Sequence, residues 1–304
     1  MTYIFSFIIT AALVPIFAKI AFKFGIVDRP DGVLKTHSRV TPYLGGLGMF
    51  LGISPILWRD SYSLMLVSVL VSVGLLDDLL SLSPKLRLLF EFTVASGIVM
   101  RFLGFHDLLY SILFVIGIVA LVNAVNMIDG MDGLAGGSVA ISAIYLFLAS
   151  ENSFSKSLSL GLIAICVAFL IYNFPPAKVF MGDAGSYLLG SLLSIILASS
   201  MRYGFDARSL KFIFPVWIYL LDLSMSVVRR VRSGKSPFGG DRDHFYDKIY
   251  KKFGGKVKTV LISYLIVGVS SSFILVKPFT LALILELVFS IFIIHYLKLL
   301  TYES

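Results

Sequence analysis

The sequence predicts an all-α integral membrane protein, a polytopic bundle of transmembrane helices. Of its 304 residues, 58% are hydrophobic and only 14% are charged, whereas charged residues make up about a quarter of a soluble domain. Its apolar runs are about twenty residues long, the length that a helix needs to cross the hydrocarbon core of a bilayer. We therefore expect a single transmembrane domain over residues 1–304, without a separate soluble domain.

Eleven apolar segments are the predicted spans. The first is expected to be retained in the membrane, because no basic residue precedes it and no small-residue cleavage site follows it. The second is the least regular, since it contains several glycines and Pro55, and Lys277-Pro278 marks a turn between the last two. The segments are residues 2–22, 44–58, 62–77, 86–103, 107–125, 134–150, 157–173, 185–201, 209–228, 259–276 and 279–298.

Basic residues are unevenly divided between the two sides of this predicted bundle. Nineteen of the 26 lysines and arginines flank one side, which the positive-inside rule places in the cytoplasm, with the N-terminus outside. This asymmetry accounts for the net charge of +8 without a nucleic-acid partner. Every cluster of acids, histidines and glycines falls on the same side. We therefore expect one active site on the cytoplasmic face of a multi-pass protein of the inner (plasma) membrane.

The segment from Asn123 to Gly137, NAVNMIDGMDGLAGG, is the most unusual of these clusters. Asn126, Asp129 and Asp132 follow one another at three-residue steps, so a helix would place them along one face. Acidic side chains are costly in lipid. The pattern therefore predicts a polar face turned toward a watery cleft, a cation, or both.

Two further clusters lie at the ends of predicted spans. Asp77 and Asp78 repel each other unless a cation or a basic partner such as Lys85 is close; a charged cap at the membrane interface is the alternative. In NFPPAKVFMGDAGS, which begins at Asn173, the prolines stop a helix and a tight turn containing Gly182 and Asp183 starts the next one. Backbone amides at a helix N-terminus attract anions, although Asp183 would also be an ordinary helix cap.

Two polar loops complete the inventory. Residues 229–258 contain ten basic residues and His244 between acids; a polybasic loop that touches anionic lipid headgroups is the plainer interpretation. Residues 29–46 form an irregular loop with Lys35 and His37, and a histidine in such a loop is usually only solvated.

Together these residues indicate a metal-dependent phosphoryl-type reaction on a membrane-embedded substrate. Carboxylates suit Mg²⁺, which keeps phosphate oxygens among its ligands, with Mn²⁺ as the alternative, and basic side chains suit phosphate. An ion-coupled transporter is a second hypothesis, but it would place its polar groups near the bilayer midplane. A CDP-alcohol phosphotransferase is a third, but DGMDGL lacks the arginine of the DGxxAR run that this class needs.

The same motifs, in this order, resemble the polyprenyl-phosphate N-acetylhexosamine-1-phosphate transferases. The matches are the Asp77-Asp78 pair with Lys85, the NxxNxxDGxDGL signature from Asn123, the FMGDAGS turn from Phe180 and the DRDH segment that ends at His244. The resemblance covers nearly the whole chain. It implies transfer of a sugar 1-phosphate from a UDP-sugar to a lipid phosphate with release of UMP, for the synthesis of a cell-envelope polysaccharide.

The resemblance also implies a role for each site residue. Asp183 would be a main Mg²⁺ ligand, with Asp77 and Asp78 at the metal and the lipid phosphate. Whether Asp77 is a base, a metal ligand or a nucleophile stays open. The implied catalytic residues are Asp77, Asp78, Asp183 and His244, and the implied substrate-binding residues are Lys35, Lys85, Asn126, Asp129, Asp132, Asn173, Phe180 (stacked on uracil), Gly182 and Arg242.

The last large loop departs from the family pattern. Many members carry His-x-His-His there, but this chain reads His244-Phe245-Tyr246-Asp247 and keeps only the first histidine. The DRDH context is similar to the N-acetylglucosamine branch, which favours UDP-GlcNAc over another UDP-N-acetylhexosamine or UDP-MurNAc-pentapeptide. A homodimer is a family expectation. Asp222 also matches a family position, with pairing inside the bundle as the alternative, and Glu91 and Glu286 are interpreted as structural.

Overall fold

The computed structural model describes residues 2–29, 40–105, 107–201, 206–237, 239 and 242–302, and this part of the chain is almost entirely helical. A two-residue antiparallel pair, β1 (Val27–Asp28) and β2 (Thr41–Pro42), is the only sheet in it. The helices are α1 (Thr2–Phe24), α2 (Gly45–Leu57), α3 (Ser61–Leu80), α4 (Pro84–Phe102), α5 (Leu108–Ile128), α6 (Leu134–Ala149), α7 (Ser153–Asn173), α8 (Gly182–Ser200), α9 (Ala207–Leu210), α10 (Trp217–Arg232), α11 (Phe245–Phe253), α12 (Lys256–Ser272) and α13 (Phe279–Tyr296), with the 3₁₀ turns η1 (Lys211–Val216) and η2 (Phe273–Leu275).

The prediction of a polytopic helical membrane protein is confirmed. Each predicted span coincides with a helix, if α9, η1 and α10 are counted as one. Within the described ranges, eight helices are long and apolar enough to cross a bilayer; α2 and α6 are apolar but shorter, and α4 is not among the eight. The count of eleven spans and the orientation of the bundle therefore stay predictions.

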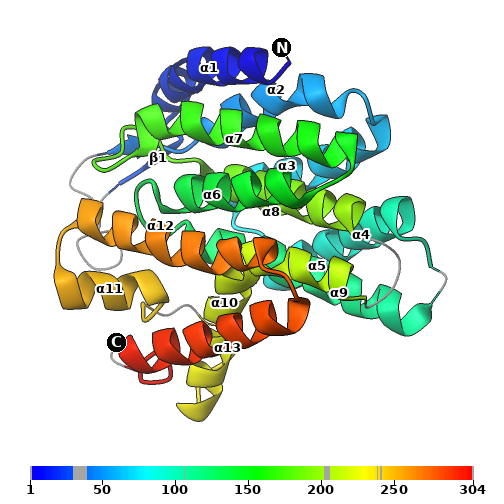
Figure 1. The fold of residues 1–304 in the computed structure, drawn as a ribbon. Coiled ribbons are helices and arrows are strands. Elements are labelled where there is room, and N and C mark those ends of the chain that lie inside the picture. Colours follow the sequence, from blue (N-terminus) through cyan, green and yellow to red (C-terminus); the bar gives the residue numbers. More distant parts are fainter. Residues whose placement is uncertain are drawn as a thin grey trace.

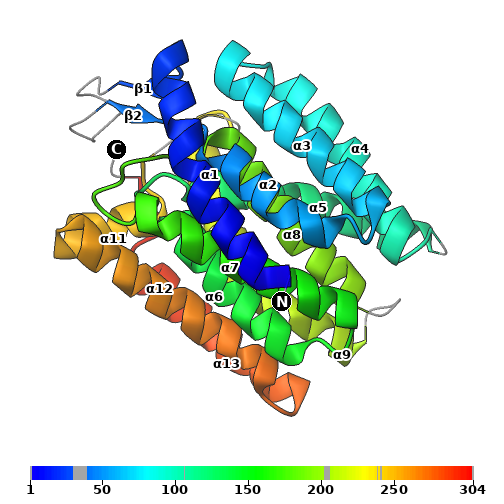
Figure 2. The same cartoon turned by 90° about the horizontal axis from the view of Figure 1, so that it is seen from above.

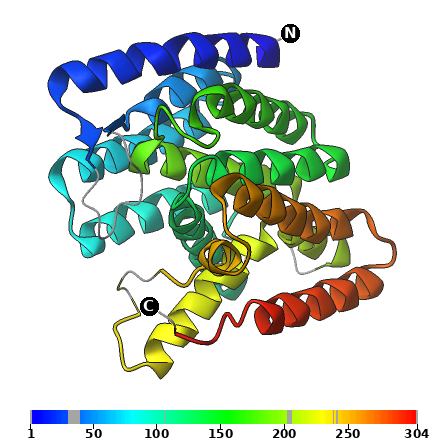
Figure 3. The same cartoon turned by 90° about the vertical axis from the view of Figure 1, so that its left-hand side faces the viewer.

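Helix α8 lies in the middle of the bundle, whereas α1 and α13 lie on opposite sides of it (Figures 1 and 3). Residues Ala184 to Ala198 of α8 are all buried. The outer helices expose large apolar side chains instead, including Phe5, Leu109 and Ile291, each more than half exposed. Such outward apolar faces are what a lipid environment requires of a helical bundle.

One end of the bundle carries most of the irregular structure. The strands β1 and β2, helix α11 and the C-terminus gather there, while α9 lies at the opposite end (Figures 1 and 2). Neither the strand pair nor α11 was predicted from the sequence. Helix α11 forms inside the 229–258 loop because Phe245, Tyr246 and Ile249 are buried on one face, while Lys251 and Lys252 stay exposed on the other.

A close approach between α3 and α8 brings two acidic motifs together. A Cβ atom on Gly74 of α3 would lie only 2.5 Å from the Asp183 carbonyl oxygen, so a side chain at position 74 would push the two backbones apart. Asp77 and Asp78 follow in the last turn of α3. The glycine therefore lets these carboxylates reach the start of α8.

Candidate functional site

A cleft of about 900 Å³ opens between the loops at this end of the bundle. Most of the predicted site residues line it, although they come from four separate stretches of sequence. Those present are Asp78, Asn126, Asp129, Asn173, Phe180, Gly182, Asp183, Arg242 and His244. Tyr246 and Asp247, at the positions of the family's later histidines, also line the cleft, as do Tyr43, Tyr250, Lys251 and Lys256, which the sequence did not single out.

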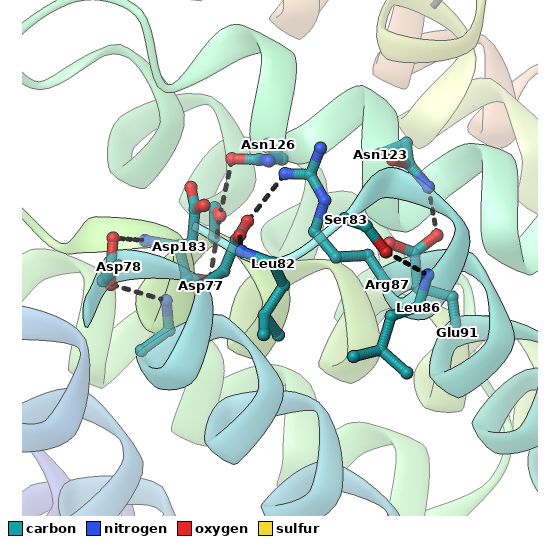
Figure 4. A network of polar contacts seen from close by, with 12 residues as sticks. Asp77, Asp78, Leu82, Ser83, Leu86, Arg87, Glu91, Asn123, Asn126 and Asp183 are labelled. Carbon is teal, nitrogen blue, oxygen red and sulfur yellow. Dashed lines mark hydrogen bonds and ion pairs between the residues drawn. The ribbon is translucent and has the colours of Figure 1, made fainter. Parts of the chain in front are cut away.

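The N-terminus of α8 holds the carboxylate of Asp78. The backbone N–H of Asp183 donates to Asp78 Oδ1 at 3.1 Å, and that of Ala184 lies 3.4 Å from Oδ2 (Figure 4). The first amides of a helix lack partners within the helix, and the helix dipole favours negative charge there. The anion that the sequence predicted at this helix end is therefore, in part, a carboxylate of the protein itself.

Asp77 is buried beside this contact and is paired with a cation. Arg87 Nη1 of α4 donates to Asp77 Oδ2 at 2.6 Å, and the Leu82 N–H donates to Oδ1 at 2.7 Å (Figure 4). Asp183 lies within hydrogen-bonding reach of the same carboxyl group. The sequence analysis missed Arg87, and Lys85, which it chose instead, is exposed and lies outside the lining of the cleft. The phosphate role of Lys85 stays a prediction.

The prediction that Asn126, Asp129 and Asp132 lie along one face of a helix is wrong. Helix α5 ends at Ile128, with Asp129 as its C-cap, and a turn precedes α6. Asn126 accepts a 2.9 Å hydrogen bond from Ser186 Oγ and faces the cleft together with Asp129. Asp132 is buried outside the cleft lining, where it accepts from the Ala177 N–H at 3.2 Å and from Lys256 Nζ at 3.4 Å.

Carboxylates crowd the inner wall of the cleft. Burial raises the pKa of Asp129 well above its usual value, and the nearby charges of Asp183, Asp78 and Asp132 raise it further. Within the described ranges, no three Asp, Glu, His or Cys side chains already converge as a complete metal site. Mg²⁺, however, commonly uses only one or two carboxylates and completes its shell with water and phosphate. One or two carboxylates from the set Asp183, Asp77 and Asp78 would suffice for that mode of binding, and the metal site stays a prediction.

Another part of the cleft lining comes from the end of α7 and the loop before α8. Asn173 is buried, with its Oδ1 accepting from the Gly133 N–H and its Nδ2 donating to the Val179 carbonyl, both at 2.9 Å. It therefore ties two site loops together. Phe180 is half-buried in the cleft lining, and its N–H donates to the Pro42 carbonyl at 2.8 Å.

A third part of the cleft lining comes from the residues around the start of α11. His244 Nδ1 lies 2.7 Å from Asp222 Oδ2 of α10, and Arg242 is exposed at the rim. Burial raises the pKa of Asp247 to about 6, although the charge of nearby His244 acts in the other direction and lowers it. Of the remaining predictions, Lys35, His37 and Asp241 lie outside the described residues.

Comparison with known proteins shows the family to which this chain belongs. The family description "Glycosyl transferase family 4" matches residues 61–201, from α3 to α8. The chain is 31% identical to a Bacillus subtilis protein named as a probable undecaprenyl-phosphate N-acetylglucosaminyl 1-phosphate transferase, over 96% of this chain and 89% of the relative. It is 33% identical to the undecaprenyl-phosphate alpha-N-acetylglucosaminyl 1-phosphate transferase of Thermotoga maritima, over 85% and 83% of the two chains. The chain belongs to glycosyl transferase family 4.

The resemblance stated from the motifs is therefore confirmed. A third relative of this family 4 transferase is the decaprenyl-phosphate N-acetylglucosaminephosphotransferase of Mycobacterium tuberculosis, 29% identical over 86% of this chain and 79% of the relative. These alignments extend well beyond the 61–201 match. The transferase is accordingly related to these enzymes over most of its length.

Gly182 is a position of the family 4 transferase where a small change should disturb the cleft. Its φ is +69°, and a Cβ atom would lie 2.5 Å from Asp78 Oδ2 and 2.6 Å from the Tyr43 carbonyl oxygen. Left-handed backbone costs an L residue about 1–2 kcal/mol. We expect Gly182→Ala to lower turnover about tenfold and to lower the melting temperature, measured in detergent. Gly117→Ala is the control, because nothing lies within 4 Å of its added Cβ, and an equal loss there would contradict this explanation.

Proposed function

We propose that this chain transfers N-acetylglucosamine 1-phosphate from UDP-GlcNAc to a polyprenyl phosphate such as undecaprenyl phosphate. The reaction would release UMP and form a polyprenyl-diphosphate sugar for a cell-envelope polysaccharide. The observation that carries the proposal is the cleft at one end of an apolar bundle. Carboxylates of Asp78, Asp129 and Asp183 line its inner wall, while Arg242 and Lys251 lie in its lining as cations for phosphate.

The atoms of the reaction balance without a water molecule or a redox partner. An oxygen of the lipid phosphate attacks the sugar-linked phosphorus of the UDP-sugar, a new P–O bond forms, and the bond to UMP breaks. Two anions must approach each other in this step, so alignment and charge neutralisation dominate the barrier. A Mg²⁺ ion held by Asp183 with Asp77 and Asp78 would supply much of that neutralisation.

The remaining residues position Asp77 and the two substrates. Arg87 neutralises Asp77 at 2.6 Å, which makes Asp77 a positional group or a metal ligand in this proposal rather than a free base. A base is not required, because the second pKa of a phosphate monoester is near 6 and much of the acceptor is already dianionic at neutral pH. Asn126, Asp129 and Phe180 would contact the nucleotide, and His244 the diphosphate.

The proposal includes a location in the inner (plasma) membrane, with the cleft on the cytoplasmic side where nucleotide sugars are made. The basic residues of the 229–258 region support this orientation, since they belong to the same end of the bundle as the cleft. Assembly as a homodimer stays a prediction from the family resemblance.

A turnover assay tests the proposal directly. The purified protein in detergent would receive undecaprenyl phosphate, Mg²⁺ and a panel of UDP-sugars, with UMP release and lipid-linked product both measured. We expect turnover with UDP-GlcNAc that stops with EDTA and returns when excess Mg²⁺ or Mn²⁺ is added. Turnover with only a different UDP-N-acetylhexosamine would support the proposed type of reaction but contradict the choice of UDP-GlcNAc as the donor. A folded protein that is inert with every UDP-sugar would refute the transferase proposal.

A further inference from the structure

A buried contact behind the cleft links a transmembrane helix to His244. Asp222 of α10 and His244 at the start of α11 are 2% and 5% exposed, and Asp222 Oδ2 lies 2.7 Å from His244 Nδ1. The second oxygen, Asp222 Oδ1, accepts the Phe245 N–H at 2.9 Å. Both oxygens of one carboxyl group therefore hold the residue pair with which α11 begins.

These two contacts determine which atom carries the proton in the hydrogen bond between Asp222 and His244. An ionised carboxylate can only accept hydrogen bonds, so Nδ1 of the histidine must carry the proton that it donates to Asp222. Ser226 Oγ, one turn along α10, lies 3.3 Å from the same nitrogen and itself accepts from Arg229 at 3.2 Å. Any contact of His244 with a substrate in the cleft must then be made by Nε2.

The plane of the ring is fixed from the other side by Tyr246. The two rings are stacked at a centroid distance of 5.5 Å and an interplanar angle of 7°. The Tyr246 hydroxyl donates to the Met127 carbonyl at 3.2 Å, which anchors it to the end of α5. A Cβ atom on Gly130 would lie 2.1 Å from that hydroxyl oxygen, so the chain leaves room there for the tyrosine. His244 therefore has little freedom to turn.

We propose that Asp222 is a positioning residue of the phosphate-transfer site. By holding Nδ1–H, it makes Nε2 the nitrogen that faces the cleft and stabilises the protonated ring that donates from Nε2 to a substrate phosphate. This inference rests on the proposed function. Carboxylate partners of metal-bound histidines fix the ring tautomer and orientation in this way, and their loss typically costs about 10- to 100-fold in activity; we expect a loss of the same order for a histidine that contacts phosphate.

Asp222→Asn separates this role from simple packing, because asparagine has the same shape. Its single acceptor oxygen is required by the Phe245 N–H, so its NH₂ group would face Nδ1 and turn the histidine into the neutral Nε2–H tautomer. We expect kcat to fall about 10- to 30-fold. Glu286→Gln is the matched control, since Glu286 is also a fully buried carboxyl but hydrogen-bonds Ser270 and Ser290, none of which lines the cleft. Its activity should be unchanged.

A double-mutant cycle shows whether Asp222 acts through His244. On the His244→Gln background, Asp222→Asn should cost less than twofold, because the group that Asp222 positions is already gone. Full additivity of the two losses would overturn the proposal. So would equal activities of Asp222→Asn and Glu286→Gln in a preparation whose wild type is active.

Nitrogen-15 spectra of labelled histidine give a second readout that does not need activity. The chain has only four histidines, and the His244 signal is identified by its loss in His244→Gln. Wild-type His244 should carry a proton on Nδ1, and Asp222→Asn should carry it on Nε2 alone. A neutral Nε2–H tautomer in the wild type would overturn the proposal even if Asp222→Asn does not fold. An inert wild type with a protonated Nδ1 would refute the proposed function but leave the Asp222 contact standing.

Discussion

Replacing Asp183 with asparagine is expected to lower kcat at least about a thousandfold. Asp183 is the second residue of α8 and lines the cleft, where Asp77 lies within its reach and Asp78 is hydrogen-bonded to its backbone. A bound metal ion contributes several kcal/mol to a phosphoryl transfer, and each 1.4 kcal/mol is about tenfold in rate. Loss of one metal-binding carboxylate should therefore remove most of the catalysis. The measurement is the rate at which the lipid-linked product forms.

The fold should survive this change. Removing one charge from a group of crowded carboxylates relieves repulsion, so the melting temperature should be unchanged or higher. Asp107→Asn is the control: Asp107 caps α5 by accepting from the Tyr110 N–H, at the end of the helix away from the cleft, and asparagine caps as well. If Asp183→Asn kept more than a tenth of the activity while EDTA abolished it, the metal would have to lie elsewhere.

The sequence predicted the helices well because the bilayer imposes their length and their apolar composition. Helix α8 begins at Gly182, three residues before the predicted span, because its first turn is polar and an apolar run cannot reveal it. Helix α11 has nine residues in a basic loop, too few to show a periodic pattern. The strands β1 and β2 have two residues each and depend on pairing across a loop.

The sequence also predicted which motifs meet, but not how their side chains are paired. Motifs that lie at span ends on one side of a membrane must share one surface, which is why Asp78, Asp183 and His244 were expected together. The partner of each group depends on helix rotation and on the course of loops. Asp132 lies outside the cleft that Asp129 lines, because the chain leaves the helix at Ile128. The pairing of Asp222 with His244 joins α10 to an unpredicted helix.

Arg87 illustrates the same limit and gives the second large prediction. Two basic residues follow the Asp77-Asp78 pair at the start of α4, and the sequence favoured Lys85. The structure places Arg87 2.6 Å from Asp77 and leaves Lys85 exposed. A signal was present, since Arg87 and Glu91 are one turn apart on α4, and Glu91 hydrogen-bonds Asn123 of α5 (Figure 4). That spacing puts Arg87 on the face of α4 that looks into the bundle.

We expect Arg87→Met to lower kcat/KM for the lipid phosphate about a hundredfold, and Lys85→Met to lower it much less. Methionine leaves the Asp77 carboxylate without its cation, so that its charge repels the incoming lipid phosphate. Removing one partner of a buried pair costs about 3–5 kcal/mol of folding stability, which we take as the upper bound for this repulsion. Because the Arg87 side chain is 30% exposed, solvent should reduce this to about 2–3 kcal/mol. Initial rates over a range of undecaprenyl phosphate concentrations, at saturating donor, measure the effect.

Arg101→Met supplies the matched control on the same helix. Arg101 pairs with Asp60 at 3.3 Å, but it lies in the last turn of α4 and is 49% exposed. Its loss should leave kcat/KM within about twofold of the wild type, as for other exposed ion pairs. Arg87→Lys should recover part of the activity, since the charge returns without the fixed guanidinium geometry. Equal effects of Arg87→Met and Arg101→Met would mean that the Arg87–Asp77 pair only supports the fold and has no part in binding the acceptor phosphate.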